Sequence, residues 1–473
     1  MIRKPLALAA SLVAVALAAP ATAAAAPGSP GAGDPFFPQA GNGGYDVRHY
    51  SLDLRYARAD NRLTGRAAIF ARSTQDLDRF NLDLRDFYAV SRVTVNLKRA
   101  SFTHVGQELS ITPRTKLKRG RSFVVVVEYA GHPQPVTDPD QSIEGWIPTD
   151  DGAFVVNEPQ GSPGWYPVND TPRDKATYDF AVTVPAGITA MANGVLVSRQ
   201  TRRDTTTWRW VSVSPMAPYL ATVTNGTFET RFRRLPGGLR EYNAVDPQTR
   251  AVTAGPPNPT LAWERLAPQP EIVEFFTGLY GKYPFESIGA IIDWAPQVGY
   301  ALESQTRPNY HRIPGASTVV HEIAHQWFGN SVTLEVWPDI WLNEGFATWS
   351  EWIYDERHGG PTAQETFAEI YATPEEGQDG QELWFPAPAA LPGAEAMFHR
   401  PVYDRGAMTL QALRQKIADD DKFFGILRAW YRENRNGNVT TADFIALSER
   451  STGLDLDGFF DVWLYEEGKP QAW

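Results

Sequence analysis

Residues 321–345 read HEIAHQWFGNSVTLEVWPDIWLNEG, and this segment carries a metal-binding pattern. On a helix, residues four positions apart lie on the same face, so His321 and His325 can hold one metal ion. Glu322 lies beside them, where its carboxylate can take a proton from an attacking water. Catalytic zinc sites use three protein ligands, and Glu344 in the following segment can supply the third. The pattern therefore predicts a zinc site in which Glu322 is the general base.

Helix signals flank both parts of this pattern. We expect one helix that starts after Pro314 and stops at Gly329, and a second helix that contains Glu344. Glu351 lies two helical turns beyond Glu344 on the same face, so it could accept a hydrogen bond from a zinc-binding histidine. Asp339 is a second candidate for this role, and it could instead cap the second helix. The plain alternative for both is an exposed helix carboxylate.

The whole segment resembles the core of the M1 (gluzincin) family of zinc aminopeptidases. In that family two histidines and the glutamate of the WLNEG-type sequence bind the metal, and they correspond here to His321, His325 and Glu344. The resemblance implies one Zn²⁺ per chain and hydrolysis of a peptide bond by a metal-activated water. It also implies further site residues elsewhere in the chain.

Two carboxylates that bind the α-amine of the substrate are implied by the resemblance. Residues 299–304, GYALES, occupy the place of the family's GxMEN exopeptidase motif, whose glutamate is Glu303 here. Residues 157–161, NEPQG, resemble a loop that reaches into the active site and places Glu158 beside the same amine. An ammonium that enters a partly dry cleft needs such partners, because its desolvation is otherwise uncompensated. The exopeptidase motif departs from the family pattern at three positions: Tyr300 for Gly, Leu302 for Met and Ser304 for Asn.

A catalytic tyrosine is implied at residues 401–406, which read PVYDRG. In the family, a tyrosine followed by an acidic or polar residue, a basic residue and glycine donates a hydrogen bond to the oxyanion that forms during hydrolysis. The corresponding residue is Tyr403. A donor at that place stabilises the transition state by roughly 3 kcal/mol.

The chain divides into a β-rich part and a helical part. Alternating apolar residues predict strands in the first part, among them 50–56, 93–97, 123–129 and 178–184. The expected fold class is multidomain α+β. With the resemblance, it becomes an N-terminal all-β saddle or sandwich domain, residues 45–240, followed by a mostly helical, thermolysin-like catalytic domain, residues 241–473.

The first residues have the composition of a secretory signal peptide. A basic start at Arg3 precedes an apolar run, residues 6–19, that is too short to span a bilayer comfortably. Small residues then suit cleavage after Ala23 or, alternatively, Ala26. We expect a signal peptide at residues 1–26 and a secreted protein, and an uncleaved membrane anchor is the alternative.

Composition narrows the partners and the chemistry. Residues 27–44 are rich in Pro, Gly and Ala and are predicted to be a disordered linker. The formal net charge is −11 and no cluster of Lys or Arg stands out, so no nucleic-acid partner is expected. No stable membrane association is expected after signal cleavage. The chain has no cysteine, which excludes disulfides and thiolate chemistry.

Taken together, these features predict a short, secreted, bacterial-type zinc aminopeptidase that acts on peptides with a free N-terminus. The resemblance covers residues 45–473 but only the family's first two domains, because larger members continue into a helical C-terminal domain. Two alternatives stay open. One is a zinc endopeptidase with an open cleft, and the other is a non-catalytic secreted binding protein on a peptidase scaffold. Side-chain preference at the first substrate residue is not fixed by the sequence.

Overall fold

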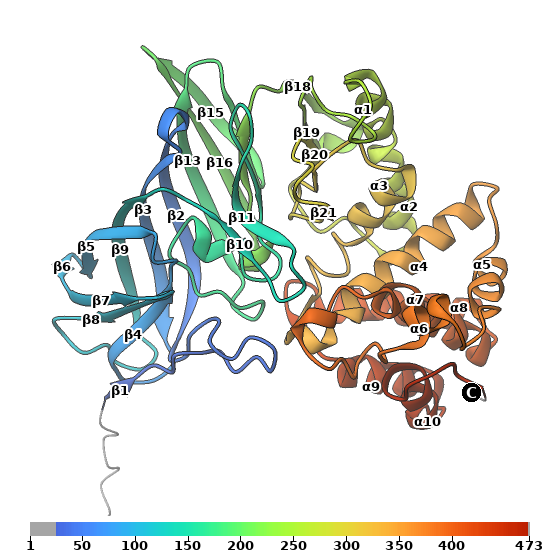
Figure 1. Ribbon diagram of the computed structural model, residues 1–473. Coiled ribbons are helices and arrows are strands. Elements are labelled where there is room, and N and C mark those ends of the chain that lie inside the picture. The colour runs from blue at the N-terminus through green and yellow to red at the C-terminus, as the bar shows by residue number, and fades with distance from the viewer. Residues whose placement is uncertain (1–24, 472–473) are drawn as a thin grey trace, which may run out of the picture.

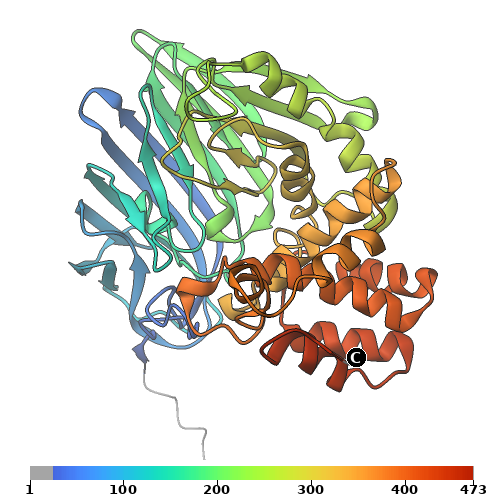
Figure 2. The ribbon, with the colours of Figure 1, turned by 45° about the vertical axis from the view of Figure 1, so that its right-hand side comes forward.

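The computed structural model describes residues 25–471, in which strands come first and most helices follow (Figure 1). The predicted signal peptide, residues 1–26, lies almost entirely outside this range. The β domain and the helical part lie side by side in both views (Figures 1 and 2). The expected fold class, an all-β domain followed by a mostly helical one, is confirmed. Within residues 25–471, no helix combines the length and the apolar character that a membrane span requires.

The centre of the N-terminal domain is a sheet of eight strands, counted over the described residues, in the order β15-β16-β13-β2-β3-β9-β5-β6. Neighbouring strands in this sheet are antiparallel, except that β13 and β2 pair with each other in parallel. Tyr50, Leu52 and Leu54 alternate along β2 and are at most 1% exposed, because every second side chain of a strand points to the same face. The strands are β2 (Tyr45–Ala57), β3 (Arg62–Ser73), β5 (Tyr88–Val95), β6 (Lys98–Arg99), β9 (Ser122–Gly131), β13 (Ala176–Pro185), β15 (Val195–Arg202) and β16 (Thr205–Met216).

Smaller sheets belong to the same domain. One has the order β1-β4-β8-β7, and another has the order β10-β11-β12-β17-β14. Figure 1 shows β10 and β11 on the side of the domain that faces the helices. The strands are β1 (Ala26–Pro27), β4 (Leu77–Asp83), β7 (Ser101–Val105), β8 (Glu108–Thr112), β10 (Pro135–Thr137), β11 (Ile143–Pro148), β12 (Ala153–Val156), β14 (Thr189–Ala192) and β17 (Val223–Gly226).

The segment 27–44 is not a disordered linker, so this prediction is wrong. It follows β1, which pairs with β4 in parallel. Phe37 is 6% exposed and makes an edge-to-face contact with Trp337 of the helical part. The Asp34 carboxylate accepts a hydrogen bond of 2.8 Å from the backbone N–H of Trp337. Composition suggested disorder because Pro and Gly dominate, but the few polar and aromatic side chains of the segment are enough to fix it on both domains.

A further sheet crosses the predicted domain boundary between residues 240 and 241. Its order is β18-β19-β20-β22-β21, and β19 and β20 pair in parallel. Residues 236–238 connect β18 and β19 as a hairpin turn, in which Gly237 and Gly238 adopt positive φ angles of 81° and 92°. The boundary was predicted because residues 236–260 are rich in Pro and Gly, but this passage begins with a hairpin inside the sheet. Strand β18 pairs with β19, and β19 pairs with β20 of the catalytic domain. The strands are β18 (Glu229–Arg234), β19 (Arg240–Val245), β20 (Ser287–Ile292), β21 (Ala301–Leu302) and β22 (Asn309–Tyr310).

In the catalytic domain α4 packs against α7, and α3, α5, α6 and α8 each pack against at least one of these two helices. A short parallel ladder, β23 (Thr333–Leu334) with β24 (Asn438–Val439), joins the loop after α3 to the loop before α9. The helices are α1 (Pro259–Leu266), α2 (Gln269–Tyr280), α3 (Ala316–Ala324), α4 (Trp341–Arg357), α5 (Ala363–Tyr371), α6 (Gln378–Trp384), α7 (Arg400–Ile417), α8 (Asp420–Asn434), α9 (Thr441–Thr452) and α10 (Asp457–Phe460).

Lys175, directly before β13, links the two domains. Its Nζ atom donates to the carbonyl oxygens of Asn330 and Ser331 at 2.9 Å, to the Thr333 hydroxyl at 2.8 Å and to the Gly437 carbonyl at 3.3 Å. A side chain of the β domain thereby holds the loop that follows α3. Because that loop adjoins the metal-binding pattern, the interface contributes to the geometry of the site.

We expect Lys175→Met to lower the free energy of unfolding by about 2–4 kcal/mol, because it leaves these buried interface oxygens without the amine group that donates hydrogen bonds to them. Urea denaturation followed by tryptophan fluorescence measures the change. The matched control is Lys118→Met, since Lys118 pairs with Asp76 on the surface and its side chain is 67% exposed. The control should change stability by less than about 0.5 kcal/mol. Equal effects of the two substitutions would contradict the role of Lys175.

Candidate active site

Helix α3 carries His321 and Glu322, and His325 follows directly after its last residue. The two imidazole rings lie edge to face, with centroids 4.6 Å apart and an angle of 77° between their planes. The predicted end of this helix was Gly329, but the helix ends earlier, at Ala324. Gly329 instead lies in the turn that follows, with a φ of 120°, and a Cβ there would come within 3.1 Å of His325 Nδ1. Glycine is required at this position because the backbone passes so close to the ring.

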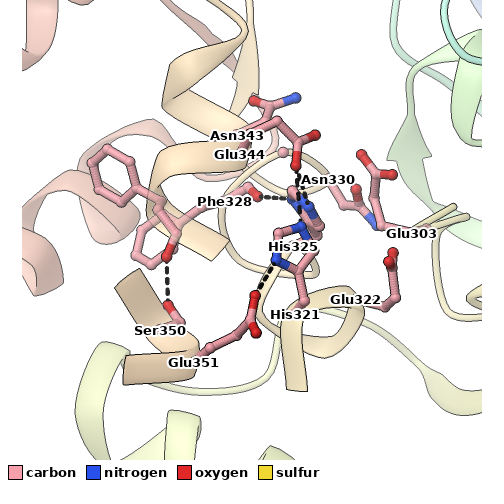
Figure 3. Close-up of polar contacts among 12 residues, drawn as sticks. Glu303, His321, Glu322, His325, Phe328, Asn330, Asn343, Glu344, Ser350 and Glu351 are labelled. Carbon is pink, nitrogen blue, oxygen red and sulfur yellow. Dashed lines mark hydrogen bonds and ion pairs between the residues drawn. The ribbon is translucent and has the colours of Figure 1, made fainter. Parts of the chain in front are cut away.

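Both histidines are oriented by hydrogen bonds at Nδ1. His321 Nδ1 lies 2.7 Å from a carboxylate oxygen of Glu351, and His325 Nδ1 lies 3.0 Å from the Phe328 carbonyl oxygen (Figure 3). A proton on each Nδ1 leaves the lone pair of each Nε2 free to bind a metal. Both Nε2 atoms face the same carboxylate oxygen of Glu344, at 3.1 and 3.3 Å.

This set of atoms fits a tetrahedral zinc ion. A tetrahedron with metal–ligand distances of about 2.0–2.1 Å has edges of roughly 3.3–3.4 Å, close to the two distances from Glu344. The three ligand atoms of His321, His325 and Glu344 lie within 4.8 Å of one another, and all three residues belong to the buried part of the site. Burial acts to raise the pKa of Glu344, but the neighbouring imidazoles outweigh it and lower the pKa to about 2. The ligand is therefore ionised at neutral pH, as metal binding requires.

The close crossing of α4 and α7 brings Tyr403 next to the three metal-binding residues. A Cβ on Gly345 would lie 2.8 Å from the backbone of Gly406, so the two helices meet at their glycines. As a result, the Tyr403 ring lies 6.2 Å from the ring of His321. Burial and then the neighbouring carboxylates, Glu344 first, hold the pKa of Tyr403 well above its ordinary value. The phenol therefore keeps its proton and can donate a hydrogen bond.

Glu158 and Glu303 lie beside the histidine–glutamate set. Both are buried, and their carboxylate oxygens lie within 4.8 Å of each other and of Glu344. One oxygen of each has no hydrogen-bond partner among the described residues. Burial raises the pKa of Glu158 well above its ordinary value, and the neighbouring Glu303 raises it further. Such a pair is unfavourable unless a cation compensates it.

The seven predicted site residues all line one cavity of about 560 Å³: Glu158, Glu303, His321, Glu322, His325, Glu344 and Tyr403. Figure 3 shows Glu303 and Glu322 on the side of the histidines that faces away from Glu351. The cavity is lined by residues of both domains, since Glu158 follows β12 and the others lie beyond β20.

Comparison with known proteins agrees with this geometry. Residues 47–220 match the model of the peptidase M1 N-terminal domain, and residues 286–463 match that of the peptidase family M1 domain. The chain belongs to the M1 family of zinc metallopeptidases. Its metal is zinc, and the two histidines and the glutamate described above form the site that fits it.

This M1 peptidase is similar to a solved structure over nearly the whole of both chains, whereas the curated relatives are longer. A mutant M1 zinc metallopeptidase from Deinococcus radiodurans, bound to a Tyr-Ser-Ala substrate, is 27% identical, with a TM-score of 0.81 over 93% of this chain and 99% of that one. Aminopeptidase N of Lactococcus lactis is 26% identical over 64% of this chain and 38% of its own length. Glutamyl aminopeptidase of Rattus norvegicus is 24% identical over 89% of this chain and 47% of its own. The chain thus spans less than half the length of these curated relatives.

Glu351 is a residue that sequence analysis could not assign. Its spacing from Glu344 was the correct signal, but Asp339 was an equal candidate. In this M1 peptidase Asp339 does not cap α4 and accepts a hydrogen bond of 2.6 Å from the Thr441 hydroxyl. Glu351 alone of the two contacts a histidine.

We expect Glu351→Ala to weaken zinc affinity roughly ten- to hundredfold, because His321 loses the carboxylate that orients its ring. Competition with a chromophoric chelator measures the affinity. Asp355→Ala is the control, since it removes an exposed carboxylate one turn further along α4. Equal zinc affinities of the Glu351 variant and the control would rule out an orienting role.

Proposed function

We propose that this M1 peptidase is an aminopeptidase that hydrolyses the first peptide bond of peptides with a free N-terminus. The observation that carries the proposal is the pair Glu158 and Glu303, buried next to the metal ligands with an unpaired oxygen on each. An α-ammonium is a cation of the size and hydrogen-bonding capacity that this pair needs. The names of the relatives, Aminopeptidase N and Glutamyl aminopeptidase, support the same activity.

The position of the pair sets which bond is cut. Glu303 is fixed through its backbone, since its carbonyl oxygen accepts hydrogen bonds from the Asn330 amide at 2.7 Å and the Gln326 amide at 3.0 Å. Gln326 directly follows His325, so Glu303 is held against the metal-binding pattern. A substrate whose ammonium binds there has its first carbonyl group near the metal ligands. The later peptide bonds of the substrate lie too far from the metal ligands to be cut.

The proton transfers are assigned to Glu322. Zinc, when bound, polarises the scissile carbonyl group and acidifies the water that attacks it. The Glu322 carboxylate accepts a proton from that water and then gives it to the leaving amine. Burial raises the pKa of Glu322 to about 8, against the opposing effect of His321 and His325. A bound Zn²⁺ would favour the ionised form of this carboxyl group, which is the form that accepts the proton.

Tyr403 supplies the hydrogen bond to the oxyanion. Its hydroxyl group keeps its proton, and its ring is placed beside His321 by the α4–α7 crossing. A donor that meets charge only as the carbonyl oxygen becomes negative lowers the barrier without tightening the binding of the substrate.

We therefore expect Tyr403→Phe to lower kcat by roughly a hundred- to thousandfold and to leave KM nearly unchanged. Steady-state kinetics on an aminoacyl-fluorophore substrate measures both constants. Zinc content should stay the same in the variant, which serves as the internal control. A rise in KM without a fall in kcat would show that the hydroxyl binds the substrate and not the transition state.

The aminopeptidase proposal is tested by one substrate in two forms, leucyl-fluorophore and its N-acetylated derivative. Acetylation removes the charge that the carboxylates recognise, so kcat/KM should fall roughly ten- to hundredfold. Glu303→Gln should lose most of this discrimination by cleaving the free form more slowly. Glu264→Gln, which changes an exposed residue of α1, should keep it. Equal cleavage of both forms would favour the endopeptidase, and no cleavage of any substrate would favour a binding protein.

Export remains a proposal, supported by the composition of residues 1–26. Strand β1 begins at Ala26, so cleavage after Ala23 would keep this strand intact, whereas cleavage after Ala26 would remove its first residue. We expect mass spectrometry of protein from the culture medium to find a chain that starts at Ala24. Recovery of the uncleaved chain from membranes would indicate an anchor instead.

A further inference from the structure

A loop of the N-terminal domain, residues 138–142 between β10 and β11, forms part of the wall of the active-site cavity. One carboxylate oxygen of Asp140 accepts hydrogen bonds from the N–H and the hydroxyl of Ser142, at 2.9 and 2.7 Å. Gln141 has a φ of 72°, and its N–H donates to the Asp138 carbonyl at 2.9 Å. The loop therefore has a defined shape. The half-exposed Asp140 makes no ion pair with any residue of the described chain.

Tyr300 connects this loop to Glu303. Its hydroxyl donates a hydrogen bond of 3.1 Å to the carbonyl of Ile143, the residue that follows the loop. Val298 and Leu302 flank Tyr300 and pack in an apolar cluster with residues of β11 and β12. The tyrosine that replaces the glycine of the exopeptidase motif thus ties the catalytic domain to the loop. The loop and Glu303 therefore belong to adjoining parts of the cavity wall.

A second connection joins the loop to Glu158. The two carboxylate oxygens of Glu144 in β11 lie 2.9 and 3.1 Å from the N–H of Gln160, two residues after Glu158. Burial raises the pKa of Tyr300 well above its ordinary value, and the surrounding carboxylates, which include Glu144, Glu158 and Asp140, raise it further. Tyr300, Glu158 and Asp140 all line the same cavity. The loop lies on the side of the cavity where the ammonium of the substrate binds.

The cavity is rich in carboxyl groups. No Lys or Arg of the described chain lines it, and six carboxylates do: Asp140, Glu158, Glu303, Glu322, Glu344 and Glu351. Zn²⁺ and one ammonium together carry three positive charges, so carboxylates remain in excess. Five of the six belong to the metal set, the general base or the amine pair. Asp140 has none of these roles.

We propose that the cavity selects substrates whose first side chain is cationic, arginine or lysine, and that Asp140 recognises this charge. The proposal rests on the aminopeptidase function and adds its substrate class. A side chain that leaves the Cα atom next to the bound ammonium reaches the wall formed by the loop and Tyr300. Its apolar stem packs on the tyrosine ring, and its charged end meets the free oxygen of Asp140.

The test compares arginyl-fluorophore with citrullyl-fluorophore, which has nearly the same shape but no charge. For the wild-type enzyme we expect kcat/KM to be roughly tenfold higher for the arginyl substrate. Asp140→Asn should bring the two values together by lowering the arginyl value alone. The amide oxygen of asparagine still accepts the hydrogen bonds from Ser142, so the shape of the loop is kept. High salt should reduce the preference of the wild-type enzyme.

Asp204→Asn is the matched control, because it removes a carboxylate from the exposed turn between β15 and β16 of the same domain. It should keep the full preference for arginine. Equal cleavage of both substrates by wild type, or an unchanged preference in Asp140→Asn, would overturn the proposal and leave the aminopeptidase function intact. Failure to cleave any aminoacyl substrate would overturn both.

A binding measurement gives a readout independent of turnover. Glu322→Gln keeps the pocket but lacks the base, so arginine amide and citrulline amide can be titrated into it by calorimetry. We expect arginine amide to bind roughly tenfold more tightly, and Glu322→Gln combined with Asp140→Asn to bind both alike. Equal affinities in the single variant would contradict recognition of charge by the pocket.

Discussion

The site depends on three carboxylates, Glu158, Glu303 and Glu344, that converge within 4.8 Å in a buried space. Like charges at this distance repel one another strongly where water is scarce, so the cluster cannot hold itself together. The surrounding fold fixes each segment from outside, as the amides of Asn330 and Gln326 do for the backbone of Glu303. Cations offset the repulsion, so the cluster favours a metal at the end of Glu344 and, in the proposed function, an amine at the end of Glu158 and Glu303.

Local rules explain how much of this could be predicted from the sequence. The four-residue spacing of His321 and His325 places both rings on one helical face whatever the rest of the chain does. The alternation of apolar residues likewise predicted β2, because every second side chain of this strand points to the buried face of the sheet. Glu344, Glu303 and Tyr403 are different, since they lie on other segments than the histidines. Glu344 was proposed because a catalytic zinc needs a third ligand, whereas Glu303 and Tyr403 were found through resemblance. The structure shows how the fold brings them into one cavity.

The errors arose where a signal depends on what surrounds it. A Pro/Gly-rich composition fits a disordered linker, a hairpin turn or an ordered strap equally well. Residues 27–44 proved to be a strap that bridges both domains, and residues 236–238 proved to be a turn within a sheet. Glu351 and Asp339 could not be separated, because both lie near the second helix. Only the tertiary contact of Asp339 with Thr441 removes it from the site.

The contact between Gly345 and Gly406 makes one unit of two sequence segments that lie about sixty residues apart. Each glycine belongs to a different motif, one beside a metal ligand and the other three residues after the tyrosine. A methyl group on either would push the helices apart and move the ligand relative to the phenol. The two positions are therefore under a joint constraint: neither can take a larger residue, because the atoms in the way belong to the backbone of its partner, which is already glycine. The position of the metal ligand Glu344 is thereby coupled to the position of the Tyr403 phenol.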